Sequence, residues 1–315
     1  MNFTKEEIKS ANYGDILTYA KFAGIALKND SRDTLKCVEH DSMIITPSKN
    51  MWFWNSRSEH GQGALSFAIK YQGLSFVDAM KAVLNSGACT VEHKSYKPKP
   101  RKPFVFNQDH VNKTCDRAYK YLHDVRGITK ETFDYLYNIG AIREDKLGNI
   151  MFIWRGVDDK EIKGVSKQGT TTDKNKYGKH GAIKQIAKNS DYGYGFWFDT
   201  PNSERIDNVR FFESPIDAIS FYELSRIKGM KNTRFISMDG LKKEVILNML
   251  NLTIKQYGAI KTVGLGVDND QAGKTFVKKM QNCFANVLDC TPSTKFGKDW
   301  NDSLKGIEKV VNKKN

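Results

Sequence analysis

The sequence VGLGVDNDQAG, residues 263–273, decides the fold that we predict. It begins as an apolar run typical of a β-strand, reaches an acidic tripeptide, and continues into a helical pattern from Lys274 to Cys283. Alternate residues of an extended segment point the same way, so Asp268 and Asp270 can face one site. Two adjacent carboxylates repel each other, and Mg²⁺ or Mn²⁺ relieves that repulsion because these ions prefer hard oxygen ligands. The competing interpretation is an Asx-type turn at a strand end.

The segment from residue 208 to residue 289 alternates between strand-like and helix-like patterns. We predict strands at 209–213, 234–238, 261–267 and 285–289, separated by helices at 215–227, 242–256 and 271–283. This alternation is typical of right-handed β–α–β units and of a mostly parallel sheet with flanking helices. Ligands of such sheets bind beyond the carboxyl ends of the strands. The sequence therefore predicts an α/β domain with its site at that edge.

Acidic residues fall at this edge. Glu213 ends the first strand, Asp217 lies one helical turn later, and Asp299 follows the last strand. Together with Asp268 and Asp270 they predict one carboxylate cluster, because the ends of neighbouring parallel strands meet at one edge. Such a cluster in a basic protein suits phosphoryl transfer, in which metal ions bridge carboxylates and phosphate oxygens. The hypothesis fails if Glu213 lies far from the two aspartates or if a lysine fills the gap.

Three motifs in this order resemble the Toprim domain of bacterial-type DNA primases, topoisomerases and some nucleases. They are ESPIDAIS at 213–220, GVDNDQAG at 266–273 and GKDWND at 297–302. The resemblance covers residues 207–310. It implies a catalytic, metal-binding core of Glu213, Asp268 and Asp270. It also implies that Asp217 and Asp299 assist with a second metal ion.

The last motif departs from the primase pattern. Primases usually alternate acid, residue, acid here, whereas Asn301 stands two residues after Asp299. Either Asp302 substitutes for the missing acid or the second metal ion binds more weakly.

The upstream segment resembles the α+β polymerase core of bacterial-type primases, and we assign it to residues 109–206. YLHDVRGITKETF at 121–133 is similar to the segment that opens this core, and residues 150–155 and 162–167 are similar to the strand pair that follows. The resemblance implies a basic face that guides the template. Candidate contacts to nucleic acid or nucleotide are Arg126, Arg155, Lys163, Lys167 and Lys298, for which ordinary solvated charge is the alternative. They would give affinity without sequence preference.

Aromatic side chains accompany these basic residues. Trp154, Tyr192, Tyr194, Phe196 and Trp197 could stack on unpaired bases. Residues of this kind are more often core, and we favour the core for all but one or two of them.

For residues 1–95 we predict a small α+β domain, with helices at 12–27 and 64–84 around a hairpin at 43–54. The pair Cys37 and His40 resembles the first half of the zinc ribbon at a primase N-terminus. The second cysteine pair is missing, and with His60 at most three of the four ligands of structural zinc are present. Zinc is therefore not expected. We predict a degenerate, metal-free domain with Cys37 and His40 as a relic pair and a core that includes Trp52, Phe53 and Trp54.

If the domain is degenerate, there are two possibilities for how the DNA template is recognised. Either choice of the start site has passed to another protein, or the domain still binds DNA through shape and charge. A basic, proline-rich linker follows at 96–108, and a basic tail ends the chain at 311–315.

Composition narrows the class of protein. The 315 residues carry a formal charge of +14, which favours a polyanionic partner, nucleic acid first, over a generic basic surface. Five cysteines without a CxxC pair argue against a disulfide framework. No apolar run approaches the roughly 18 residues of a membrane helix, and the N-terminus is too polar for a signal peptide. We expect a soluble, cytoplasmic protein without a membrane partner.

The leading functional hypothesis is a primase-like, metal-dependent nucleotidyltransferase. It would synthesise primers on single-stranded DNA from nucleoside triphosphates, for replication of a plasmid or other mobile element, with a helicase, relaxase or replication initiator as partner. Glu213 would double as general base, unless a metal-lowered hydroxyl pKa suffices. One alternative is a Toprim nuclease, although the GxxxxGK[ST] loop of an associated ATPase is missing. The other is a non-catalytic DNA-binding replication accessory protein, which the lost zinc ligands and Asn301 favour.

Overall fold

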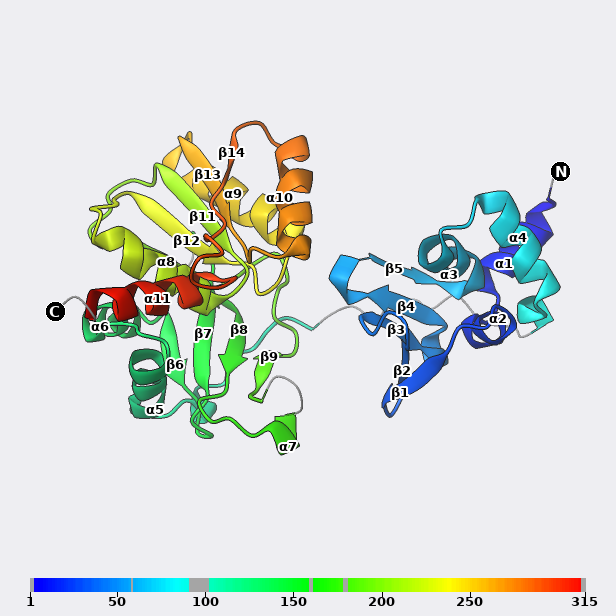
Figure 1. Cartoon of the computed structure of the whole chain (residues 1–315), viewed down its shortest axis with the longest axis horizontal. Helices are drawn as coiled ribbons and strands as arrows, with labels where there is room; N and C mark the ends of the chain where they lie inside the picture. Colours follow the sequence, from blue (N-terminus) through cyan, green and yellow to red (C-terminus); the bar gives the residue numbers. More distant parts are fainter. Residues whose placement is uncertain (1–2, 58, 91–101, 159–160, 178–180, 313–315) are drawn as a thin grey trace. The chain divides into compact units, whose positions relative to one another are not determined.

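The computed structural model describes residues 3–57, 59–90, 102–158, 161–177 and 181–312. The chain divides into two compact units, Met1–Pro100 and Arg101–Asn315 (Figure 1). Part of the predicted linker and part of the predicted tail lie outside the described residues. The boundaries predicted at 95, 108 and 206 therefore stay predictions.

The N-terminal unit is an antiparallel sheet of five strands in the order β1 to β5, with helices packed on one face (Figure 1). Its strands are β1 (Leu27–Ser31), β2 (Thr34–Cys37), β3 (Met43–Thr46), β4 (Met51–Trp54) and β5 (Glu59–Gln62). Its helices are α1 (Lys5–Tyr13), α2 (Ile16–Phe22), α3 (Gly63–Gln72) and α4 (Phe76–Asn85). Short 3₁₀ turns cover Pro47–Lys49, Asn55–Arg57 and Ala88–Thr90. The predicted hairpin is confirmed as β3 and β4.

The single helix predicted at 12–27 is wrong. Helix α1 ends before Gly14, and α2 begins after Asp15, whose side chain accepts a hydrogen bond from the Thr18 amide at 2.7 Å. Asp15 therefore acts as a helix N-cap, and a capping side chain favours a new start over continuation. The helix predicted at 64–84 is divided in two, because Gly73 ends α3 in the left-handed region at a φ of 70° and α4 begins at Phe76.

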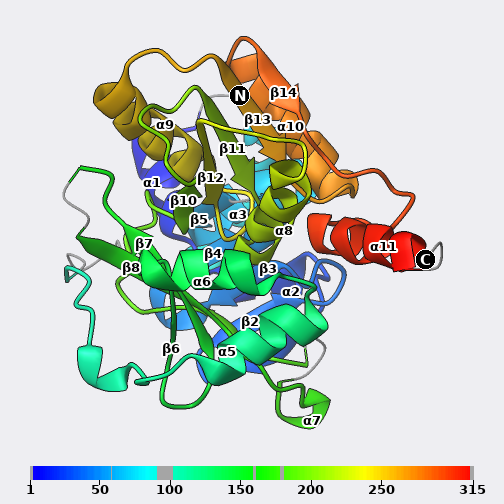
Figure 2. The same ribbon diagram turned by 90° about the vertical axis from the view of Figure 1, so that its left-hand side faces the viewer.

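The second unit contains two sheets. The first has the order β6-β7-β8-β9 and is antiparallel. Its strands are β6 (Ile142–Glu144), β7 (Ile150–Arg155), β8 (Ile162–Gln168) and β9 (Lys184–Ile186). Helices α5 (Asp116–Lys120) and α6 (Lys130–Asn138) lie on one side of this sheet in both views (Figure 2). A 3₁₀ turn at Gln108–His110, a π-helical turn at Tyr121–Val125 and the short α7 (Lys174–Tyr177) complete this part.

The second sheet has the order β10-β12-β11-β13-β14, with β10 antiparallel and the other pairs parallel. Its strands are β10 (Trp197–Asp199), β11 (Asn208–Phe212), β12 (Thr233–Ser237), β13 (Thr262–Gly266) and β14 (Val287–Asp289). The helices are α8 (Pro215–Arg226), α9 (Lys243–Tyr257), α10 (Gln271–Cys283) and α11 (Trp300–Asn312). The predicted α/β fold with a mostly parallel sheet is confirmed. Helix α11 was not predicted.

Helices cover both faces of this sheet. Apolar side chains of α8 and α11 share a core with Phe212 and Phe235, whereas those of α9 and α10 pack with Phe211 and Ile236. The first core also contains buried residues of α5, α6 and β7. The two sheets of the second unit are therefore joined by one continuous apolar core.

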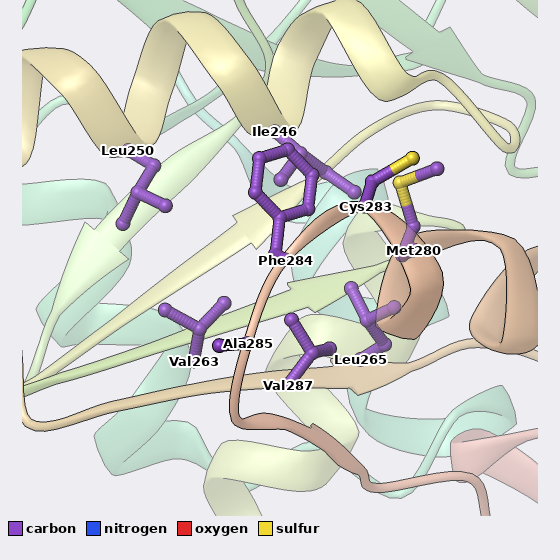
Figure 3. A pocket seen from close by; sticks show the side chains of 9 residues that line it. All are labelled: Ile246, Leu250, Val263, Leu265, Met280, Cys283, Phe284, Ala285 and Val287. Atoms are coloured by element: carbon purple, nitrogen blue, oxygen red, sulfur yellow. The ribbon is translucent and has the colours of Figure 1, made fainter.

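One pocket of the second unit is apolar. It measures about 330 Å³ and lies between α9, α10 and the strands β13 and β14 (Figure 3). Ile246, Leu265, Met280 and Phe284 are among its lining residues, and no carboxylate takes part. Among the described helices, none combines the length and the apolar character needed to cross a bilayer.

Candidate active site

The carboxyl end of β11 places Glu213 at the edge of the parallel sheet. The strand ends at Phe212, and Ser214 caps α8 by accepting a hydrogen bond from the Asp217 amide at 3.2 Å. Pro215 at the first helical position suits this start because its ring presets φ and its missing N–H has no helical partner there. The turn leaves the Glu213 carboxylate half-buried at the strand tip.

The carboxyl end of β13 places the next two acids. Asp270 caps α10 by accepting a hydrogen bond from the Gly273 amide at 3.0 Å, so the tripeptide forms a capped turn at the strand end, as the competing interpretation predicted. Gly273 lets the helix start pack tightly on the strand end, since a Cβ there would lie 2.0 Å from the Asp268 carbonyl oxygen. Asp268, with a side chain 14% exposed, is held by Lys298, whose Nζ lies 2.7 Å from Oδ2.

Asp217 and Asp299 complete the group from the α8 and α11 starts. Asp217 is buried and accepts hydrogen bonds from the Ser214 hydroxyl at 2.6 Å and the Asn301 amide at 3.4 Å. Asp299 accepts a hydrogen bond from the Asp302 amide at 2.7 Å, as a helix cap does. Three helices, α8, α10 and α11, therefore begin beside these carboxylates, and the positive ends of their dipoles favour negative charge there.

Asn301 has a structural role at this position. Its amide Nδ2 donates to the Arg126 carbonyl at 2.7 Å and to the Ser220 hydroxyl at 3.0 Å, and its side chain is buried. Asp302, the substitute acid considered from sequence, is exposed. The structure thus ties residue 301 into the interior, where a second carboxylate would add to the repulsion on Asp217.

The electrostatics of the group indicate an excess of negative charge. Burial, followed by repulsion from Asp268 and Asp270, raises the pKa of Glu213 to about 7. Burial and the nearby Asp299 raise the pKa of Asp217 to about 7. Burial also raises the pKa of Asp268, although its bond to Lys298 opposes this. Glu213 is therefore close enough to the two aspartates to be repelled by them.

The donor chemistry fits a divalent metal ion, because every side chain of the group offers carboxylate oxygens. The neighbouring Asn269 Oδ1 is also buried without a hydrogen-bond donor. Across the described parts of the chain, however, no three acidic, histidine or cysteine side chains converge at metal-ligand geometry. Lys298 also lies 3.7 Å from the Asp270 carboxylate, so an ammonium group bridges the two aspartates. This lysine pairs with the two aspartates themselves, whereas the counter-evidence named from the sequence was a lysine between Glu213 and that pair.

Glu213 also lines a cleft of about 610 Å³. Strands β8 and β9 contribute Lys167 and Lys184, and the end of β12 contributes Asp239. Tyr192, 44% exposed, also lines the cleft. A volume in this range is typical of sites for small molecules and cofactors.

Asp239 and Lys184 were not found from the sequence. Asp239 follows β12 as Glu213 follows β11, so the strand-end rule could have found it. Its carboxylate accepts a hydrogen bond from the Ser166 hydroxyl at 3.2 Å, and burial raises its pKa to about 6. Lys184 stands in an irregular basic segment that offers no comparable signal.

The basic candidates separate into two kinds. Arg155 donates to the carbonyl oxygens of Ile139 at 2.7 Å and Trp197 at 3.2 Å, so contacts within the fold engage its guanidinium, and its assignment as a nucleic-acid contact stays a prediction. Arg126 is half-buried between the Tyr121 hydroxyl and Asn301, and its assignment likewise stays a prediction. The remaining candidates reach the surface as members of ion pairs: Lys163 with Glu161, Lys167 with Asp145, and Lys298 with Asp268.

The aromatic candidates are mostly core, as favoured from the sequence. Trp154, Phe196 and Trp197 are buried, whereas Tyr192 faces the cleft. Tyr194 is only partly buried and packs against two of the cores.

The relic pair of the N-terminal unit is packed against aromatic rings. Cys37 is fully buried, and desolvation raises the pKa of its thiol to about 11. The His40 ring lies 5.4 Å from the Trp54 ring and 5.7 Å from the Tyr71 ring. His60 instead stacks on Phe53 across β4 and β5. The prediction that Phe53 belongs to the core is wrong: it is 43% exposed, because neighbours on a strand point to opposite faces.

Two family models match segments of the second unit, and one related protein matches nearly the whole chain. A family model described as Toprim-like matches residues 211–304, and a model described as a protein of unknown function (DUF3991) matches residues 120–204. The Toprim-like domain predicted from the sequence is thereby confirmed. The Bacillus anthracis protein "Uncharacterized protein pXO2-78" is 35% identical over 322 residues, which cover 98% of this chain and 91% of the relative. The chain belongs to the pXO2-78 family.

Solved structures similar to this pXO2-78 family member come from primases. The match to the primase fragment of the bacteriophage T7 primase-helicase covers 87% of this chain and 93% of that fragment, with 16% identity and a TM-score of 0.46. The Aquifex aeolicus primase, with its zinc-binding and RNA polymerase domains, covers 99% and 86%, with 13% identity and a TM-score of 0.37. Similarities of this size do not decide an activity, which has to be argued from the site.

Proposed function

We propose that the chain is a primase-like, metal-dependent nucleotidyltransferase that synthesises primers on single-stranded DNA. The observation that carries the proposal is the position of Glu213. Asp268 and Asp270 repel its carboxylate, which raises its pKa, and Glu213 also lines a cleft together with Lys167 and Lys184. A triphosphate bound in the cleft would have its charged end beside the acids, where phosphoryl transfer takes place.

The roles of the side chains follow from this placement. Glu213, Asp268 and Asp270 would hold Mg²⁺ or Mn²⁺, with Asp217 and Asp299 behind them. The chemistry that such an ion supplies is neutralisation of the phosphate oxygens and of the attacking hydroxyl. Glu213, which lines the cleft, would also accept the proton of that hydroxyl. Lys167 and Lys184 would bind phosphates without sequence preference, and Tyr192 offers a ring for base stacking.

The same features support a role in replication of a mobile element. The B. anthracis relative carries the designation pXO2 in its name, and the formal charge of +14 suits a nucleic-acid partner. A helicase, relaxase or replication initiator stays a predicted partner.

The test is primer synthesis on mixed single-stranded templates with nucleoside triphosphates and Mg²⁺ or Mn²⁺. The double variant Asp268→Asn, Asp270→Asn should lower synthesis at least about 100-fold, because it removes the charges that would bind the metal ion. DNA binding should stay within about twofold, since it depends on basic side chains elsewhere. The exposed Asp109→Asn, away from the acidic group in the sequence, is the matched control and should leave synthesis unchanged.

The assay also separates the alternatives. Degradation of labelled DNA without extension indicates a Toprim nuclease. Neither reaction, with DNA binding intact, indicates the non-catalytic replication accessory protein. The ammonium group of Lys298 between the two aspartates favours that second candidate, because it neutralises the acids without a metal ion. Synthesis by the double variant at the wild-type rate would refute the assigned site.

A further inference from the structure

Lys298 is fixed to the acidic tripeptide by its own backbone. Its carbonyl oxygen accepts a hydrogen bond from the Asn269 amide at 2.7 Å, and the Asn269 side chain donates to the Pro292 carbonyl, also at 2.7 Å. The loop before α11 is therefore pinned at two points to the loop after β13. This attachment keeps the Lys298 backbone beside Asp268 and Asp270 whether or not its side chain contacts them.

The Lys298 side chain, in contrast, is free to leave. It is 59% exposed, and its flexible four-carbon stem carries a compact charge. Its partners differ: Asp268 Oδ2 at 2.7 Å has a side chain only 14% exposed, whereas Asp270 Oδ2 at 3.7 Å has one 43% exposed. Ion pairs with this much solvent contact are weak, so releasing the ammonium group costs little.

The contact and a bound metal ion exclude each other. A divalent ion coordinates a carboxylate oxygen at about 2.1 Å, and Asp268 Oδ2 already accepts a hydrogen bond from the ammonium group. Two cations on one oxygen would repel each other strongly at that range. Binding of a metal ion to this oxygen therefore requires Lys298 to move away from it.

We propose that Lys298 is a built-in counter-cation that a divalent metal ion displaces, and that the displaced ammonium group then binds a phosphate of the nucleotide. The proposal rests on the proposed metal site and adds a mechanism of ordered loading to it. Without metal, Lys298 limits repulsion within the acidic cluster. With metal, its pinned backbone keeps the ammonium group next to the place where the metal ion brings an anion. Lys298 thus lowers the affinity for the bare metal ion and raises the affinity for the metal–nucleotide complex.

The test compares full-length wild type with Lys298→Met, which keeps the length of the side chain and removes its charge. Titration calorimetry with Mn²⁺ alone should give binding about three- to tenfold tighter for the variant, because the competing cation is gone. Titration of Mn²⁺-saturated protein with the Mn²⁺–ATP complex should give binding about three- to tenfold weaker. Lys295→Met is the matched control: it changes the same charge in the same loop, and its ammonium group lies over the Phe296 ring instead.

Melting temperature provides a second, independent measurement. In chelator the variant should melt below wild type, and saturating Mn²⁺ should remove the difference, because the metal ion replaces the missing counter-cation. Mn²⁺ binding by Lys298→Met that is equal to or weaker than wild type would overturn the proposal. So would a matching effect of Lys295→Met, or unchanged binding of Mn²⁺–ATP.

A separate variant distinguishes failure of this proposal from failure of the proposed function. If wild type binds Mn²⁺ and Asp268→Asn abolishes the binding, the metal site stands and the Lys298 titrations decide the present question alone. If neither wild type nor Lys298→Met binds Mn²⁺ at millimolar concentration, the metal site and the counter-cation role are both refuted.

Discussion

The surroundings of polar side chains differ between the relic pair of the N-terminal unit and the acidic edge around Glu213. Cys37 is buried as a neutral thiol, and His40 packs between two aromatic rings, so packing satisfies both. Glu213 and Asp217 are buried beside other carboxylates that repel them, and their pKa values are raised, so packing leaves this repulsion uncompensated. The first region is stable as it stands, whereas the second is more stable with an added cation. The contrast is between polar side chains that their neighbours satisfy and carboxylates that repel one another.

The largest expected effect tests the claim that aromatic packing supports the N-terminal unit. Trp52 is 2% exposed and donates to the Ser66 hydroxyl at 2.9 Å, so Trp52→Ala should lower the free energy of unfolding of this unit by about 3 to 5 kcal/mol. Urea denaturation followed by circular dichroism measures the change.

The adjacent Phe53 provides the control. It is exposed on the other face of β4, so Phe53→Ala should cost less than about 1 kcal/mol. Equal losses for the two variants would contradict the assignment of the core. A melting temperature of the wild-type unit that falls with a zinc chelator would show that the region is not a metal-free relic.

An intermediate effect concerns pH and the acidic edge. Glu213 and Asp217 have pKa values of about 7 in the folded protein, against ordinary values of 4.5 and 3.8. The folded state therefore binds more protons than the unfolded state between these values. Metal-free stability should fall as pH rises from about 4.5 to about 7.5, by on the order of 1 to 3 kcal/mol.

Urea denaturation in chelator at several pH values measures this dependence. Glu213→Gln should flatten it, because the neutral amide does not titrate, and saturating Mn²⁺ should flatten it by offsetting the charge. Glu131→Gln, on the exposed surface of α6, is the control and should leave the slope as it is. Stability that rises with pH over this interval would contradict the repulsion inferred at the edge.

The smallest effect concerns the basic wall of the cleft. Lys184 is exposed on β9, so Lys184→Gln should weaken single-stranded DNA or nucleotide binding about two- to threefold and lower the salt dependence by about one ion. Fluorescence anisotropy across a salt series measures both quantities. Lys81→Gln on the N-terminal α4 is the control. An equal loss of binding affinity for both variants would indicate general charge attraction and not a binding site that includes Lys184.

The parallel sheet and its acids could be predicted because their signals are local. Strand and helix alternate with clear periodicity, and the five carboxylates occupy turns that chain order alone assigns to one edge. Helix α11 could not be found in the same way, since the motif from Gly297 to Asp302 was interpreted for its acids and not for the cap that Asp299 provides. The hydrogen bonds of Arg155 could not be predicted either, because its acceptors are backbone carbonyls 16 and 42 residues away along the chain.

The sequence by itself determined the order of strands and helices, the carboxylates at the strand tips and the loss of zinc ligands, because each depends on residue type and short-range spacing. The tertiary structure decided which charges meet. It placed Lys298 on Asp268, turned Asn301 into an interior contact and brought Lys184 and Asp239 to the cleft beside Glu213. Those contacts join segments distant in the chain, and only the packing of sheets and helices sets them.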